Sequence, residues 1–168
     1  LEERPQMKWL RKDHECEDER ALKYFIKDEK NNLEFNERTL KLLWECCQIP
    51  DFVKKTYGNH YEVIRNVFKF LNSEKGLISE DYMRLQLMKL DKLEGNVDSL
   101  SNRIANVRTW SYVSNKNNWV ENQNYWIEKT KHLEDRLSDR LHEELTKTFI
   151  DKRAVSYTHL RAHETSLH

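Results

Sequence analysis

The sequence has 168 residues, and its 29 basic and 29 acidic side chains cancel to a formal net charge of zero. That balance excludes a uniformly basic nucleic-acid surface, although a local basic patch can still contact phosphates, because such contacts depend on where the charges lie. Only 3 glycines and 2 prolines interrupt the chain. Since β-rich proteins need many turns, so few breakers predict an all-α fold, an irregular bundle of about six helices with a long last helix.

The chain begins with a segment of mixed charge, and we expect residues 1–13 to form an incoming linker. A helical domain is predicted over residues 14–153. Its first helix is expected from His14 to about Lys30, because an acidic run ahead of the apolar positions suits the positive end of a helix.

Three further short helices are predicted in the first two thirds of the chain. One follows the capping residue Asn36 and ends before Pro50, since the residue preceding proline avoids the α region. The next begins at Gly58, and the last begins at Ser79, which two acidic residues follow. The first and last of these three are expected to bury their apolar residues, namely Leu40, Leu43, Trp44 and Cys47, and Tyr82, Leu85, Met88 and Leu90.

Two long amphipathic segments, 96–113 and 126–153, are the main elements that we expect. In the first, residues at helical spacing form one stripe: Val97, Leu100, Ile104, Val107 and Ser111. In the second, apolar residues recur every four positions: Leu133, Leu137, Leu141, Leu145 and Phe149. Each such step turns the row by about 40° around the helix, so we expect several neighbours to cover it. Asn122 is the expected N-cap of this last helix, and Trp119 and Trp126 are expected to pack the preceding connection onto the bundle.

The last residues differ in character from the rest of the chain. Ala154–Thr165 reads AVSYTHLRAHET, and its back-translation resembles a transposase mosaic end with a sequencing-library adaptor. We therefore expect residues 154–168 to be a non-native tail that carries no information about the fold.

No catalytic residue, cofactor site or metal site is predicted in this chain. Its glycines stand alone, so a phosphate-binding loop is missing from the sequence. Cys16, Cys46 and Cys47 lack the spacing of a zinc site and are expected to stay reduced. Without an apolar run of membrane-spanning length, the chain is expected to be cytoplasmic and to have no membrane partner.

One stretch has the composition of a binding surface for single-stranded nucleic acid. Basic and aromatic residues alternate along the first long helix and the loop after it, namely Arg103, Arg108, Trp110, Tyr112 and Lys116. Cations that contact phosphates and rings that stack on bases are the groups that bind a single strand. The alternative is structural, with Trp110 in the core and the arginines capping or paired with acidic neighbours.

Three strings of the sequence match those of a known family in order and spacing. They are LLWECCQIPDF at Leu42–Phe52, LDKLEGNVDSLSNRIANVRTW at Leu90–Trp110, and LEDRLSDRLHEEL with FIDKR within Leu133–Arg153. The chain resembles the region after the motor in bacterial relatives of the mitochondrial degradosome helicase, over about Trp9 to Arg153. It departs from that family in an asparagine-rich connection and in Asn122, where aspartate is common.

The resemblance implies an ATP-dependent superfamily-two helicase acting on RNA or DNA. In that family two RecA-like motor domains use ATP and magnesium, and C-terminal helical elements pack on them. This sequence would then be an accessory domain, with the RecA-like motor domains as its partner and single-stranded RNA or DNA as a possible ligand. The alternative function is a helical protein–protein interaction module without nucleic-acid contact. Exposure of Arg103, Arg108 and Lys116 on one concave face would favour strand contact, and their use in intramolecular pairs would favour the alternative.

Overall fold

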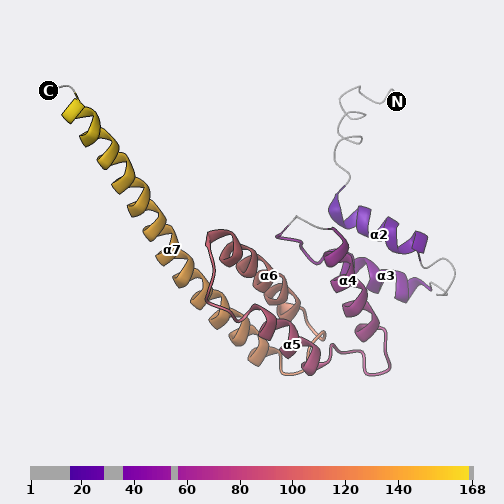
Figure 1. The fold of residues 1–168 in the computed structure, drawn as a ribbon. Coiled ribbons are helices and arrows are strands. Elements are labelled where there is room, and N and C mark those ends of the chain that lie inside the picture. The colour runs from indigo at the N-terminus through magenta and orange to yellow at the C-terminus, as the bar shows by residue number, and fades with distance from the viewer. Residues whose placement is uncertain (1–15, 29–35, 54–56, 167–168) are drawn as a thin grey trace, which may run out of the picture.

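A computed structural model describes residues 16–28, 36–53 and 57–166 (Figure 1). These residues form an all-α fold whose last helix is long, which confirms the predicted fold class. The helices are α2 (Glu17–Asp28), α3 (Glu37–Cys47), α4 (Tyr57–Leu71), α5 (Glu80–Leu90), α6 (Val97–Asn115) and α7 (Gln123–Ser166). The predicted linker at residues 1–13 lies outside the described residues.

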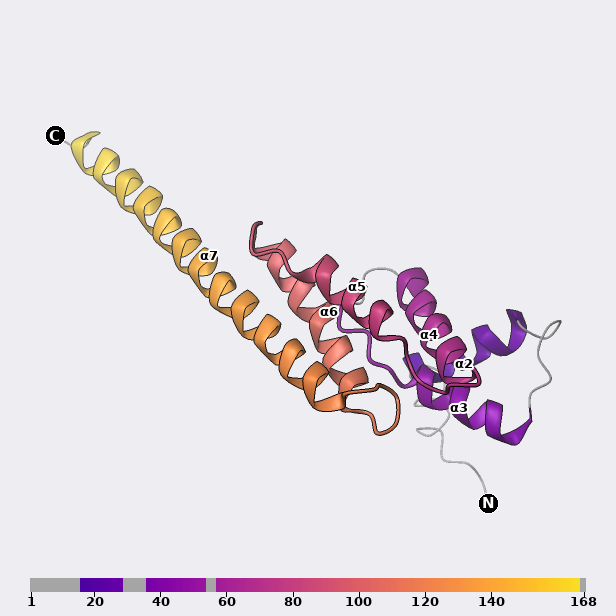
Figure 2. The same cartoon turned by 90° about the horizontal axis from the view of Figure 1, so that it is seen from below.

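The helices form two groups, α2 to α4 and α5 to α7, as Figures 1 and 2 show from two directions. In both views α6 lies beside the first part of α7, and theirs is the most extensive contact between helices of the described chain. The core is continuous between the groups. Thr109 of α6 donates a hydrogen bond to the carbonyl of Pro50 at 3.1 Å, and the Ile78 amide donates to the Trp119 carbonyl at 2.8 Å.

Two asparagine side chains fix the starts of α3 and α6. The side-chain oxygen of Asn36 accepts a hydrogen bond from the Thr39 amide at 2.8 Å, as the predicted cap requires. Asn96 does the same for the Ser99 amide at 2.9 Å. Both residues have extended backbone angles, so each satisfies an amide of the first turn that has no partner within the helix.

Asn122 immediately precedes α7, but its side chain has a different role from the predicted cap. Its backbone is left-handed, with a φ of 55°, a conformation that asparagine tolerates better than most residues. The side-chain amide donates to a carboxylate oxygen of Glu80 at 2.8 Å. Asn122 therefore ties the start of α7 to the start of α5.

The stripe predicted for α6 is confirmed at its centre. Leu100, Ile104 and Val107 are buried in the core, together with further residues of α6 and the connection after it, namely Trp110, Val113, Ser114, Trp119 and Val120. Trp126 is also buried, so both predicted tryptophans pack the connection onto the bundle. Each buried indole removes a large apolar area from water.

The apolar face predicted for α5 is wrong at two of its four residues. Tyr82 and Leu90 are partly buried against the core, whereas Leu85 and Met88 are exposed, and the fully buried residues of the helix are Met83 and Leu87. Apolar residues occur all round this helix, so periodicity alone does not select a face, and its neighbours decide which side is covered. Leu40 of α3 is likewise exposed rather than buried.

The leucine row of α7 is covered only at its beginning, which corrects the expectation of neighbours along its whole length. Leu133 and Leu137 are buried and Leu141 is partly buried, but Leu145 is 46% exposed and Phe149 is 62% exposed. The cause is length, because the 19 residues of α6 span about 28 Å and the 44 residues of α7 span about 66 Å.

The last helix does not stop at the end of the amphipathic segment 126–153, because α7 continues to Ser166 through residues expected to be a non-native tail. Residues 154–166 contain neither glycine nor proline, and extending an existing helix costs far less than starting one. Residues 151–159 are all exposed, so this part of the helix adds nothing to the core.

Two leucines of one row test the limit of the core. We expect Leu137→Ala to lower the free energy of unfolding by about 2–5 kcal/mol, because the side chain is fully buried. Leu145→Ala makes the same change at the second leucine of the row after Leu137. It should lower the free energy of unfolding by only about 0.5 kcal/mol, as surface substitutions do. Chemical denaturation of both variants measures the difference, and equal losses would show that the row is covered throughout.

Candidate binding surface

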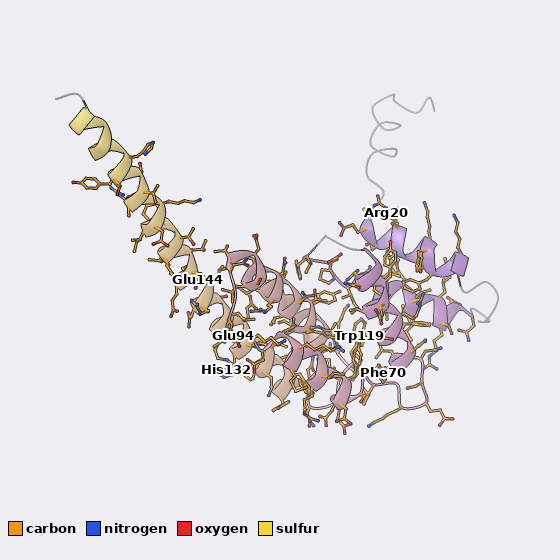
Figure 3. All side chains as sticks on the ribbon, in the orientation of Figure 1. Arg20, Phe70, Glu94, Trp119, His132 and Glu144 are labelled. Atoms are coloured by element: carbon orange, nitrogen blue, oxygen red, sulfur yellow. The ribbon has the colours of Figure 1, made fainter. Side chains whose placement is uncertain are left out.

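The five residues predicted to bind a single strand all lie on α6 or at its end, and the structure gives most of them partners within the protein. Trp110 is buried, with its ring centroid 5.7 Å from that of Tyr82 in an edge-on arrangement. Tyr82 in turn lies 5.1 Å from Phe70, which Figure 3 labels on α4. Trp110 therefore links the two helix groups through a chain of edge-on and tilted ring contacts and is not available to a base.

Lys116 lies at the C-terminal end of α6 between two aromatic rings. Its ammonium nitrogen is 5.5 Å from the centroid of Tyr112 and 5.6 Å from that of Trp119. Both distances are in the range of cation–π attraction. Lys116 and Tyr112 thus hold the connection between α6 and α7 against α6.

Arg103 holds the segment between α5 and α6. Its guanidinium donates hydrogen bonds to the carbonyl of Lys92, at 2.7 Å, and to the carbonyl of Glu94. Gly95 follows with a φ of 131°, and a side chain there would meet Ser99 and the same guanidinium. The left-handed conformation at Gly95, which few other residues adopt, is therefore held in place by an arginine nearly two turns into α6.

Arg108 pairs with Glu134 across the α6–α7 contact, with a nitrogen–oxygen distance of 2.8 Å. The arginine side chain is more than half exposed, so this pair contributes about 0–1 kcal/mol. All three basic candidates consequently have partners within the protein, and they do not form one free basic face.

Cys46 and Cys47, the two adjacent cysteines at the end of α3, are buried. Burial raises the pKa of the Cys46 thiol well above its ordinary value, and neighbouring Cys47 and Glu45 raise it further. Burial also raises the pKa of Cys47 to about 12, with Asp18 adding to the effect. Both thiols are therefore protonated at neutral pH, and a protonated thiol is a poor nucleophile.

Within the described residues, no cluster of three or more His, Cys, Asp and Glu side chains is suited to hold a metal ion. None of the helices described here combines the length and apolar character that crossing a lipid bilayer requires.

A surface that the sequence did not predict lies between α5 and α7. Met88 and Tyr125 are exposed there beside Arg84, Lys129 and Arg136. The signal was present in the sequence, because positions 125, 129, 132 and 136 follow helical spacing along α7. Periodicity alone predicts that Met88 is buried, and only its observed exposure shows that it belongs to this surface.

Comparison of the chain with protein-family models, with curated proteins and with solved structures found no match. The resemblance to the helicase family therefore rests on the strings of sequence quoted above.

The hold of Arg103 on the α5–α6 segment can be measured. We expect Arg103→Ala to lower the free energy of unfolding by about 1 kcal/mol, because it removes charged donors from two carbonyls. Arg103→Lys keeps the charge but loses the forked geometry of the guanidinium, so its free energy of unfolding should lie between those of the parent and of Arg103→Ala. Denaturant titration gives the order of the three proteins, and an Arg103→Ala variant as stable as the parent would contradict the account.

Proposed function

We propose that this chain is a helical accessory domain of an ATP-dependent nucleic-acid helicase, and that it supports the motor by packing against it. The helicase part of the proposal rests on the strings within Leu42–Phe52, Leu90–Trp110 and Leu133–Arg153. The packing part rests on one observation, the uncovered apolar row of α7.

The row continues without a break from the core into solvent. Leu133 and Leu137 are buried, and Leu145 and Phe149 follow at the same spacing but are about half exposed or more. Exposed apolar surface that continues a core is typical of a face that another protein covers. A motor domain packed beside α7 would bury it.

Contact with the threaded strand is not required by this proposal. Arg103, Arg108 and Lys116 have intramolecular partners, and a phosphate would have to compete with them. Hydrolysis of ATP would belong to the motor, because this sequence contains no phosphate-binding loop.

The second candidate is a helical protein–protein interaction module that has no connection with nucleic acid. The intramolecular use of the three basic residues favours it as much as it favours motor support. The two candidates differ in what the apolar row contacts, a RecA-like motor or an unrelated protein.

The upstream reading frame and an association assay test the proposal together. We expect the coding sequence upstream of residue 1 to encode a phosphate-binding loop and RecA-like domains. We also expect the helical domain to co-purify with those RecA-like domains. Phe149→Asp should weaken association about tenfold or more, because it puts a charge into the apolar contact.

Ile150→Asp is the matched control. Ile150 is also exposed, but a step of about 100° places it on a different face of α7, so its variant should associate normally. An upstream frame without ATPase motifs would contradict the helicase proposal. Normal association of the Phe149 variant would contradict the role of the row.

A further inference from the structure

A cavity of about 380 Å³ lies where the three helices of the first group meet. Its walls come from the start of α2, from the end of α3 with the chain that follows it, and from the start of α4. Two cysteines, Cys16 and Cys47, line this cavity from different elements. The fold therefore brings two thiols to one enclosed space.

The topology of α2 and α3 explains why these two residues meet. The helices are nearly equal in length, at 12 and 11 residues, and they follow one another in the chain. Figures 1 and 2 show them side by side and running in opposite directions. The start of α2, which Cys16 directly precedes, therefore lies beside the end of α3, where Cys47 is the last residue.

Cys47 is held in place, whereas Cys16 can adjust its position. Cys47 is 3% exposed, and an imidazole nitrogen of His60 donates to the nearby Ile49 carbonyl at 2.8 Å. Cys16 is exposed and precedes the first residue of α2. Packed helix axes lie about 8–10 Å apart, and a disulfide needs Cα atoms about 4.4–6.8 Å apart, so one residue has to approach the other. Helix ends open at low free energy, so Cys16 can make this approach.

The two thiols differ in how readily they attack a disulfide. Access to solvent and thiolate content decide which thiol reacts first, and Cys16 is the exposed one. Burial raises the pKa of the Cys47 thiol to about 12, and the charge of Asp18 adds to this effect. Asp18 lies in the first turn of α2 and lines the same cavity, so its influence agrees with the closeness of the two helix ends.

We propose that Cys16 and Cys47 form a redox-sensitive latch, a reversible disulfide that ties the start of α2 to the end of α3. A low-molecular-weight disulfide is the oxidant. Cys16 loses its proton to water and attacks one sulfur of that molecule, whose sulfur–sulfur bond breaks and releases one small thiolate. Cys47 then gives up its proton and attacks the Cys16 sulfur of the mixed disulfide, which releases the second small thiolate. Two protein thiols are thereby oxidised, and one small disulfide is reduced to two thiols.

The shared cavity makes the second step selective for Cys47. Its attack is intramolecular, and this proximity offsets its low content of thiolate. Cys46 is adjacent in sequence, but it is 0% exposed and is not among the residues that line the cavity. The new bond closes a loop that contains α2 and α3, and such a cross-link stabilises a fold chiefly by constraining the unfolded chain. This inference does not depend on the helicase proposal.

The test treats the full chain with oxidised glutathione and analyses it by tandem mass spectrometry without reduction. We expect most of the folded chain to carry a cross-link between Cys16 and Cys47, and added reductant to remove it. In guanidinium chloride the unfolded chain should link Cys16 to either neighbour, whereas the folded chain should favour Cys47 over Cys46 about tenfold or more. The oxidised chain should also have a higher denaturation midpoint than the reduced chain.

Cys46→Ala is the matched control and should keep the cross-link. Cys16→Ser should abolish it, and Cys47→Ala should stop at the glutathione adduct of Cys16. Circular dichroism should show that the variants stay helical, and the fragment spectra of the parent identify the linked residues without any variant. A parent that stops at the glutathione adduct, or that does not react, would overturn the proposal. Equal use of Cys46 and Cys47 in the folded chain would also overturn it, because the fold would then not select the pair.

Discussion

The antiparallel contact between α6 and α7 is the constraint on which the rest of the structure depends. It is the largest helix–helix contact in the described chain, and its residues extend the core to both helix groups. Through Trp110 it reaches Tyr82, and through Thr109 it reaches the chain after α3. Because α6 is less than half as long as α7, the same contact also decides where the core stops.

The unequal lengths explain both exposed surfaces. Beyond α6 the leucine row of α7 has no neighbour, so Leu145 and Phe149 face solvent. On another side of α7, Leu133 is buried, but Met88 of α5 and Tyr125 of α7 are exposed at the edge of a groove between the two helices. The basic residues of α6 are meanwhile used to fasten loops and helices together. The exposed apolar residues of α7 therefore lie where its neighbouring helices stop.

The sequence predicted well wherever a local interaction decides the structure. The cap at Asn36 depends on one side chain and a nearby amide, and the stripe of α6 depends on spacing that only one face satisfies. It failed where distant residues decide. The buried face of α5 depends on which helices lie beside it, and Asn122 bonds to Glu80 rather than to its own helix. The structural alternative for Arg103 is confirmed in kind, because its guanidinium is used within the protein, but its partners are the carbonyls of Lys92 and Glu94, which spacing does not reveal.

Hydrogen–deuterium exchange along α7 measures where the core stops, because amide protection follows local packing. We expect strong protection through Leu137, a decline near Leu141, and fast exchange from Leu145 onward, as in a helix without neighbours. Uniform protection through Phe149 in the isolated chain would contradict the dependence of the core on α6, since the second half of the leucine row would then already be covered.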